Sequence, residues 1–268
     1  MKQFVLSYEP NANGIIRLYG GDYHYLIRVR RLKTGSSFTA LLPGGAETRV
    51  KILSTVDNIL IGQCEGAFAP SESALPPIIL FQGLPKGTKM DLIVRQAAEG
   101  GVSEIIPFES EFSTAKLKGE NSQAKMTRWE RIIKEARQQS GSIIPTAVKP
   151  PCTVDGVLGY WGELKKARPG GVGLLLHQDP LDKGSFHDYL YNNPEFAALA
   201  VGPEGGFSPA EAARFMAAGF KPLVMGNTIL RTETAALYGA AAIRIILLES
   251  STWALKTPEP PPASGSAS

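Results

Sequence analysis

Three short runs of apolar residues in the second half of the chain constrain its fold most. They read GLLLHQ (173–178), AALAVG (197–202) and PLVMG (222–226), and each ends in glycine or a polar turn. Continuous apolar runs of this length are typical of parallel strands that are buried on both faces. Similar runs alternate with helical patterns upstream, so residues 78–252 are expected to form an α/β domain with a parallel sheet.

Further strands and helices are expected in the same domain. The strands read IILFQGL (78–84) and VSEIIPF (102–108), and the helices read TKMDLIVRQAAEGG (88–101) and TRWERIIKEARQQSG (127–141). In the second helix, Trp129, Ile133 and Ala136 recur at helical spacing before a terminating glycine. A last helix, 235–248, is rich in alanine, which predicts close packing within the domain or across a dimer interface.

Residues 1–70 have a different pattern, with short alternating or apolar runs separated by glycines. Strands and turns at this spacing suggest a small β-barrel. The segment from Arg17 to Lys51 holds seven cationic residues against two acidic ones, in a chain whose net charge is only +3. Its basic run RVRRLK (28–33) is either a solvated face or a surface for the phosphate backbone of a nucleic acid.

The remaining segments and residue types exclude several classes of protein. A proline-rich stretch at 71–77 is expected to link the two domains, and residues 253–268 are expected to form a disordered tail. Two cysteines and three histidines show no metal-ligand spacing, so no metal site is expected. Because no apolar stretch has the length of a secretion signal or a membrane span, a cytoplasmic protein without membrane contact is expected.

Two polar loops follow apolar runs, at the strand ends where open parallel sheets bind ligands. The first reads GPEGG (202–206), which is explained either by a tight turn or by backbone amides that approach a bound molecule. Ser208, Pro209 and Glu211 then have the order of a capping box at a helix start. Neither a phosphate-binding loop nor a dinucleotide fingerprint is present, which disfavours those two ligand classes.

The second loop, MGNTILRTE (225–233), carries more polarity than a strand-to-helix turn needs. Its apolar residues Ile229 and Leu230 are expected to pack inward, and Thr232 suits the cap of the following helix. Arg231 does not suit that place, because a cation beside the positive end of a helix is mildly repelled. Another interaction must therefore hold Arg231 there.

Together these loops resemble the paired C-terminal motifs of the SPOUT-class RNA methyltransferases. The most specific part is GPEGGFSPAE (202–211) followed by MGNTILRTETAAL (225–237). HYLIRVRRLKTG (24–35) is similar to the N-terminal barrel motif of the family, and KGTKMDLIVRQAAEGGVSEIIPF (86–108) and EARQQSGSIIP (135–145) follow in the expected order. The resemblance covers most of the chain and is strongest toward the ribosomal RNA small subunit methyltransferase E family.

This resemblance implies a fold and an activity. The fold is α/β, with a C-terminal parallel-sheet domain that contains a trefoil knot, preceded by a small PUA-like β-barrel that binds RNA. The activity is the transfer of a methyl group from S-adenosylmethionine to N3 of a uridine in 16S ribosomal RNA. The small ribosomal subunit is the implied substrate, and a homodimer is the implied active form.

The resemblance also implies roles for individual residues. The residues implied for S-adenosylmethionine are Leu176, Gly202, Pro203, Gly205, Gly206, Met225, Gly226, Ile229, Leu230 and Thr234. Arg231 is expected to stabilise the anion of uracil, with Glu204 or Glu233 as the proton acceptor. The residues implied for RNA contact are Arg17, Arg28, Arg30, Arg31, Lys33, Gln138 and Ser140.

The chain departs from the family pattern at a few positions. Arg95 and Gly100 stand where lysine and leucine are usual, and Gly141 stands where arginine is usual. Arg95 keeps the positive charge, whereas Gly141 lacks a side chain that could contact RNA. Gln138 and Ser140 stay as candidates for substrate contact, although a polar helix end explains them equally well.

Two other functions stay open. A related knotted enzyme could methylate another RNA position, such as a ribose hydroxyl, or the chain could bind RNA without catalysis. The intact motifs GPEGG (202–206) and LRTETA (230–235) argue against the non-catalytic alternative.

Overall fold

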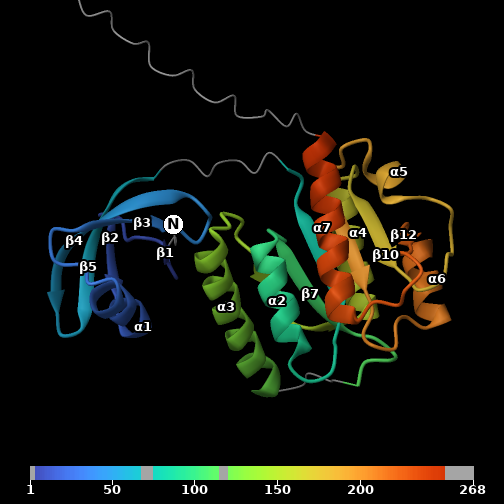
Figure 1. Cartoon of the computed structure of the whole chain (residues 1–268), viewed down its shortest axis with the longest axis horizontal. Coiled ribbons are helices and arrows are strands. Elements are labelled where there is room, and N and C mark those ends of the chain that lie inside the picture. Colours follow the sequence, from blue (N-terminus) through green and yellow to red (C-terminus); the bar gives the residue numbers. More distant parts are fainter. Residues whose placement is uncertain (1–3, 68–74, 115–119, 251–268) are drawn as a thin grey trace, which may run out of the picture.

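The computed structural model describes residues 4–67, 75–114 and 120–250. A curled sheet forms the N-terminal part, a second sheet with helices on both faces forms the C-terminal part, and helix α3 (Glu120–Ser140) lies between them (Figure 1). Most of the predicted linker 71–77 and the whole predicted tail 253–268 lie outside the described residues. Within the described ranges, no helix combines the length and apolarity that a bilayer crossing requires.

The N-terminal sheet has five strands that pair in the order β1-β3-β4-β5-β2. They are β1 (Phe4–Val5), β2 (Ile15–Leu18), β3 (Ser37–Leu41), β4 (Glu47–Val56) and β5 (Ile59–Ala67). Neighbouring strands are antiparallel except β1 and β3. Asp57 and Asn58 both have positive φ, which suits the tight turn between β4 and β5. The expected short strands are confirmed, and the sheet curls into a half-barrel (Figure 1).

One segment of the N-terminal part differs from the expected strands and turns. Residues 20–29 are helical, as α1 (Gly20–Tyr23) and the π-helix η1 (His24–Val29). Leu26 is fully buried in the core of the curled sheet, whereas Arg28 is exposed. Leu26 and the partly buried Tyr23, Tyr25 and Ile27 pack against the sheet, which leaves the basic side of the segment in solvent.

The C-terminal sheet confirms the predicted parallel arrangement. Its strands are β6 (Ile78–Gly83), β7 (Glu104–Glu109), β8 (Ala147–Val148), β9 (Cys152–Thr153), β10 (Val172–Leu176), β11 (Ala197–Val201) and β12 (Lys221–Leu223). They follow the order β12-β10-β11-β6-β7-β8, with β9 also paired to β7, and every pairing is parallel. All residues of β6 and β11 are buried, as expected for central strands covered on both faces.

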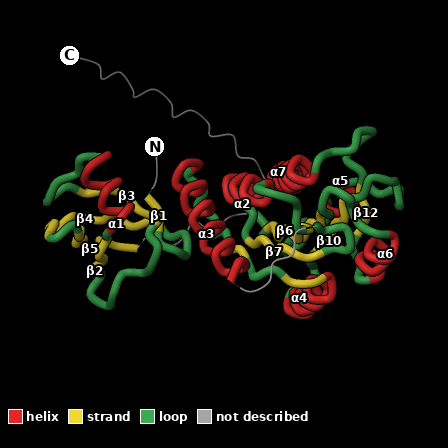
Figure 2. The backbone as a smooth tube through the Cα atoms, turned by 90° about the horizontal axis from the view of Figure 1, so that it is seen from below, coloured by secondary structure: helices red, strands yellow, loops and turns green. Residues whose placement is uncertain are grey.

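Helices cover both faces of this sheet. They are α2 (Lys89–Glu99), α4 (Val154–Ala167), α5 (Phe186–Leu190), α6 (Pro209–Ala217) and α7 (Thr232–Ser250), in addition to α3. In Figure 2, α2 and α7 lie on one face of the sheet, and α4 and α6 lie on the other. Strand β6 shows why: Ile78 and Leu80 pack with α2, α3 and α7, whereas Phe81 packs with α4 and α6.

Several predicted helix ends are confirmed. Helix α2 ends before Gly100 and α3 ends before Gly141, whose φ is +77°. Ser208 and Glu211 form the predicted capping box at the start of α6. Helix α4 was not expected from the sequence, because three glycines lower the helix propensity of VDGVLGYWGELKKA (154–167).

Lys134 of α3 joins the two parts of the molecule. Its Nζ donates hydrogen bonds to both carboxylate oxygens of Asp22, at 2.9 and 2.8 Å, and to Oγ of Ser7 at 2.7 Å. The same ammonium lies 5.7 Å from the centre of the Phe4 ring, a distance suited to a cation–π contact. The curled sheet is therefore fixed against α3 by one partly buried cation.

Candidate active site

A cavity of about 630 Å³ lies at the carboxyl ends of β10, β11 and β12. Its walls come from residues that follow these strands, in the ranges 176–180, 201–207 and 224–232, and from Lys89 and Ala235. Open parallel sheets bind ligands at this edge, and the volume is within the usual range of small-molecule sites.

Most residues predicted to contact a cofactor line this cavity. They are Leu176, Gly202, Pro203, Gly205, Gly206, Met225, Gly226, Ile229 and Leu230. Thr234, in the first turn of α7, is not among the described residues that line it. Of the predicted catalytic residues, Arg231 and Glu204 line the cavity, whereas Glu233 does not.

The loop GPEGG is a tight turn and also a wall of the cavity. The backbone N–H of Gly206 donates to the carbonyl of Pro203 at 2.9 Å, and Gly206 has a φ of +70°. A Cβ added to Gly202 would lie 2.8 Å from the backbone of Gly206, so a side chain would open the turn. The two explanations of this loop are therefore compatible.

The capping box after this turn also anchors it. The Glu211 carboxylate accepts hydrogen bonds from the Ser208 backbone N–H at 3.0 Å, from Ser110 Oγ at 3.0 Å and from the Glu111 backbone N–H at 2.8 Å. Glu211 is itself buried, at 6% exposure. Its hydrogen bonds fix the start of α6 to the loop that follows β7.

The second loop leaves much of its backbone open. No hydrogen bond between described residues uses the main chain of 224–230. Gly226 has a φ of +106°, a conformation that other residues rarely adopt. The expectation that Ile229 packs inward is wrong: its side chain is 82% exposed at the rim, while Leu230 is half-buried. Ile229 therefore contributes to the rim of the cavity and not to the protein interior.

Thr232 connects the two loops through buried hydrogen bonds. Its Oγ1 donates to the carbonyl of Gly202 at 2.6 Å and accepts from Nε2 of Gln82 at 2.9 Å. Thr232 is 4% exposed and Gln82 is fully buried. The Thr232 hydroxyl was expected to cap α7, but it instead ties the start of that helix to the GPEGG loop and to β6.

Three charged residues line one end of the cavity, and a fourth, Glu233, lies beside them. Lys89 Nζ is 2.7 Å from Oε1 of Glu204 and 3.8 Å from Oε2 of Glu233, and Arg231 lines the same end. The hydrogen bond to Glu204 raises the pKa of Lys89. Burial alone would raise the pKa of Glu204, but hydrogen bonds from Lys89 and from backbone N–H groups bring it below its ordinary value.

Lys89 is a charged residue of the cavity that was not predicted from the sequence. It lies within the quoted motif KGTKMD (86–91), where a lysine at a helix start reads as an ordinary surface residue. One signal was available: a cation at the N-terminus of a helix is as unfavourable there as Arg231 is before α7.

The residues predicted to contact RNA lie apart from the cavity. Arg17 is on β2, Arg28 is in the last turn of η1, and Arg30, Arg31 and Lys33 follow it; all of them are exposed. None of these five cations forms an ion pair with another described residue. Gln138 is half-buried and Ser140 is exposed at the end of α3.

Two further findings concern other chemistry. Among the described residues, no group of His, Cys, Asp and Glu side chains is arranged to hold a metal ion. Both cysteines, Cys64 and Cys152, are half-buried free thiols, and burial raises the pKa of each. A raised thiol pKa lowers the thiolate fraction that nucleophilic chemistry requires.

Comparison with known proteins places this site in a family. A family model described as an RNA methyltransferase domain matches residues 71–244. Ribosomal RNA small subunit methyltransferase E of Synechocystis is 32% identical over 91% of this chain and 78% of its own length. The protein of the same name from Aquifex aeolicus is 34% identical over 85% of this chain and 93% of its own length.

The chain belongs to the RNA methyltransferase family. The family match spans the whole described part of the parallel sheet and both loops of the cavity. Among solved structures, a methyltransferase of Legionella pneumophila in complex with S-adenosylmethionine superposes with a TM-score of 0.77 at 25% identity. That likeness covers 91% of this chain and 98% of the Legionella chain, so it includes the curled N-terminal sheet.

Proposed function

We propose that this chain transfers a methyl group from S-adenosylmethionine to N3 of a uridine in 16S ribosomal RNA of the small ribosomal subunit. The observation that carries the proposal is the cavity between the loops 202–206 and 224–231, which holds most residues implied for the cofactor. The names of the relatives and the cofactor bound in the Legionella structure agree with it.

The cavity suits S-adenosylmethionine in shape and chemistry. Leu176, Val201 and Met225 offer apolar walls for an adenine ring, and the unpaired backbone of 224–230 offers donors and acceptors for its edges. A Cβ added at Gly226 would meet no protein atom within 4 Å, so the glycine leaves open space beside the loop. When bound, the cofactor supplies an electrophilic methyl carbon on a positively charged sulfur.

Arg231 is the residue that we assign to the substrate side. Uracil N3 is a good nucleophile only after it loses its proton, and the negative charge then spreads over O2 and O4. The guanidinium of Arg231 is exposed at the cavity and has no ion-pair partner among the described residues, so it is available to that anion. Glu204 and Glu233 are the candidate proton acceptors. Alignment of N3 with the methyl carbon supplies much of the remaining rate enhancement.

The two parts of the chain are assigned separate tasks. Residues 1–70, as a PUA-like barrel with five exposed cations, bind RNA, and residues 78–252 carry methyl transfer. We propose that the second part contains the trefoil knot of the family. In support, the chain returns from β12 at the sheet edge to α7 near the middle and buries Thr232 between Gly202 and Gln82.

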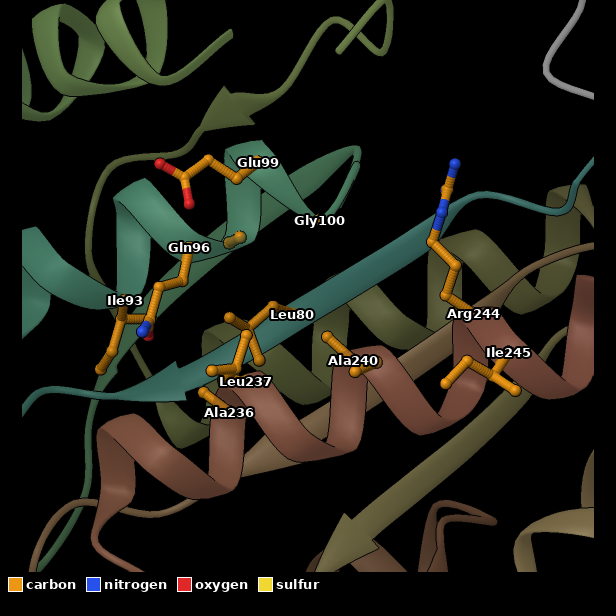
Figure 3. Close-up of a pocket in the computed structure, with 12 residues that line it drawn as sticks. Leu80, Ile93, Gln96, Glu99, Gly100, Ala236, Leu237, Ala240, Arg244 and Ile245 are labelled. Carbon is orange, nitrogen blue, oxygen red and sulfur yellow. The ribbon is translucent and has the colours of Figure 1, made fainter. Parts of the chain in front are cut away.

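A homodimer is the proposed form in solution. Figure 3 shows a groove in which Leu80 of β6 lies between α2 and the small residues Ala236 and Ala240 of α7. Beside it, Leu237 is 38% and Ile245 is 53% exposed, so an apolar surface stays uncovered in the single chain. A second copy of α7 fits such a surface, because alanines permit close helix contact.

Sedimentation velocity tests the dimer. The wild-type protein is expected to sediment as a dimer at micromolar concentration, and Ile245→Glu is expected to sediment as a monomer because it places a charge on the apolar surface. Met216→Glu, on α6 at the opposite face, is the matched control and should stay dimeric. A monomeric wild-type protein would contradict the assignment.

Product mapping tests the function itself. The protein is incubated with S-adenosylmethionine and undermethylated small ribosomal subunits, and the nucleosides of the 16S RNA are identified by mass spectrometry. We expect 3-methyluridine. Ribose-methylated nucleosides in its place would favour the related knotted enzyme. If calorimetry detects no S-adenosylmethionine binding, only the RNA-binding alternative survives.

A further inference from the structure

Two cations line the same end of the cavity, and each stands at the N-terminus of a helix. Lys89 is the first residue of α2, and Arg231 directly precedes α7. A helix N-terminus carries partial positive charge, so a cation there needs a compensating interaction. For Lys89, that interaction comes from Glu204 at 2.7 Å and Glu233 at 3.8 Å.

Glu204 is weakened as a base, and Glu233 does not line the cavity. Glu204 already accepts hydrogen bonds from Lys89 Nζ and, at 3.1 Å, from the backbone N–H of Lys86, and its pKa is below its ordinary value. Oε2 of Glu233 is buried without a hydrogen-bond partner, and Glu233 is not among the described residues that line the cavity. Lys89 contacts both of them and itself lines the cavity.

We propose that Lys89 is a second catalytic cation, whose ammonium contacts a carbonyl oxygen of the target uracil and stabilises the anion formed when N3 loses its proton. This proposal rests on the function proposed above. In it, Glu204 and Glu233 are not the proton acceptors considered above; they hold Lys89 in place and keep it charged. The proton passes to solvent water, which reaches this end of the cavity because the Lys89 side chain is 35% exposed.

The atoms and electrons of this step balance. The N3–H bond breaks, the proton passes to water, and the electron pair stays on the ring, spread over N3, O2 and O4. The N3 pair then forms a bond to the methyl carbon while the carbon–sulfur bond breaks. The pair of that bond stays on sulfur, which becomes a neutral thioether. Lys89 keeps its proton throughout.

The charges around Lys89 determine whether its side chain is protonated at neutral pH. Glu204 faces it from the loop after β11, and Glu233 and Arg231 face it from the start of α7. The hydrogen bond to Glu204 raises the pKa of Lys89, and Arg231 opposes that effect weakly. Lys89 is therefore a cation throughout the neutral pH range and suits charge stabilisation rather than proton acceptance.

Single-turnover rates against pH test this assignment, with small subunits as substrate and saturating S-adenosylmethionine. Lys89→Met is expected to lower the rate at neutral pH by about 100-fold, as for the loss of one charge-stabilising donor. It should also move the rising limb of the pH–rate profile upward by about one unit or more, because the anion is harder to form. Lys89→Arg should restore most of the rate. If Lys89 had a purely structural role, Lys89→Met would not move the rising limb of the pH–rate profile.

Substrate acidity gives a second and independent test. Small subunits assembled on RNA transcribed with 5-fluorouridine carry a more acidic N3, so the anion forms without as much help from the protein. The deficit of Lys89→Met should then shrink by about 10-fold or more, the effect of roughly one pKa unit. An unchanged deficit on this substrate would overturn the proposal. A larger rate loss in Glu204→Gln than in Lys89→Met would also overturn it, since it would make Glu204 the base.

Binding of the small subunits in the absence of S-adenosylmethionine tests the role of Lys89 without measuring methyl transfer. Affinity of the wild-type protein for the 5-fluorouridine subunits should increase as pH rises through the ionisation of N3, whereas Lys89→Met should lack this increase. Calorimetry should show S-adenosylmethionine binding unchanged in Lys89→Met. If the wild-type protein forms no 3-methyluridine, the proposed function fails; if it does and the variant keeps the wild-type pH dependence, only the role of Lys89 fails.

Discussion

Arg231 was selected as a candidate site residue because its position is electrostatically unfavourable. A guanidinium directly before a helix is unfavourable, and the structure gives it no ion-pair partner among the described residues while placing it at the cavity. We predict that Arg231→Ala lowers single-turnover methyl transfer by about 10²–10³-fold, the usual effect of removing one charge-stabilising donor. Calorimetric affinity for S-adenosylmethionine and the unfolding temperature should stay near wild type. Unchanged turnover would refute the proposed role of Arg231 in stabilising the uracil anion. Arg231→Lys serves as the charge-conserving control.

Gly226 shows a different kind of constraint at the residue scale. Its φ of +106° is strained for any side chain, although no protein atom lies within 4 Å of an added Cβ. Gly226→Ala is therefore predicted to cost about 1–3 kcal/mol of unfolding free energy through backbone strain alone. Urea unfolding measures this cost. Gly44→Ala, at a turn with equal space and without positive φ, should change stability little; an equal loss in both variants would disprove the strain argument.

The residues that the sequence did and did not reveal differ in a physical way. Glycines and the capping box were predictable because their function depends on local backbone geometry, which adjacent residues encode. The role of Lys89 was not predictable, because its partner Glu204 is more than 100 residues away in the chain. The exposure of Ile229 was not predictable either, because it depends on the position of this residue at the rim of the cavity.

At the scale of elements, Thr232 is the link between the two loops. Its hydroxyl joins α7, the carbonyl of Gly202 and the amide of Gln82, all of them buried. Thr232→Val leaves the buried Gly202 carbonyl without its partner and removes one of the two acceptors of Gln82 Nε2, which still donates to the Gly83 carbonyl, so it should cost about 1–3 kcal/mol. S-adenosylmethionine should also bind more weakly in calorimetry, because the spacing of the loops is no longer fixed. Thr232→Ser keeps the hydroxyl and should retain affinity; a valine variant with full affinity would count against the link.

Elements differed in how well their sequences predicted them. The central strands were found because burial on both faces makes them continuously apolar, as in AALAV (197–201). Helix α4 was not predicted because its glycines interrupt the helical periodicity of its apolar residues. Its stability comes from Val157 and Trp161, which pack against the sheet face opposite α2 and α7. The helical segment 20–29 was also missed; Leu26 is its one fully buried residue, and Tyr23, Tyr25 and Ile27 pack partly against the same core.

At the scale of the whole molecule, Lys134 fixes the N-terminal part to the rest. Its ammonium contacts Asp22, Ser7 and the Phe4 ring from α3. Lys134→Met should lower the unfolding free energy by about 1 kcal/mol, since the contact is only partly buried. RNA affinity should fall while S-adenosylmethionine affinity stays, because the basic surface is no longer held in a fixed position. Lys125→Met on the same helix is the stability control, as Lys125 is exposed and forms no ion pair with a described residue. Equal stability losses in the two variants would remove Lys134 as the anchor.

The sequence by itself determined the parallel α/β sheet, the strand-rich N-terminal part and the two polar loops that line the cavity. These features depend on periodicity, glycine and helix caps, which are properties of short segments. Only the tertiary structure decided that Thr232 ties the loops together, that Lys89 stands between Glu204 and Glu233, and that Ile229 faces solvent. Most of those contacts join residues that are distant in the chain. They form, and stabilise the protein, only after the sheet has brought its strand ends to one edge.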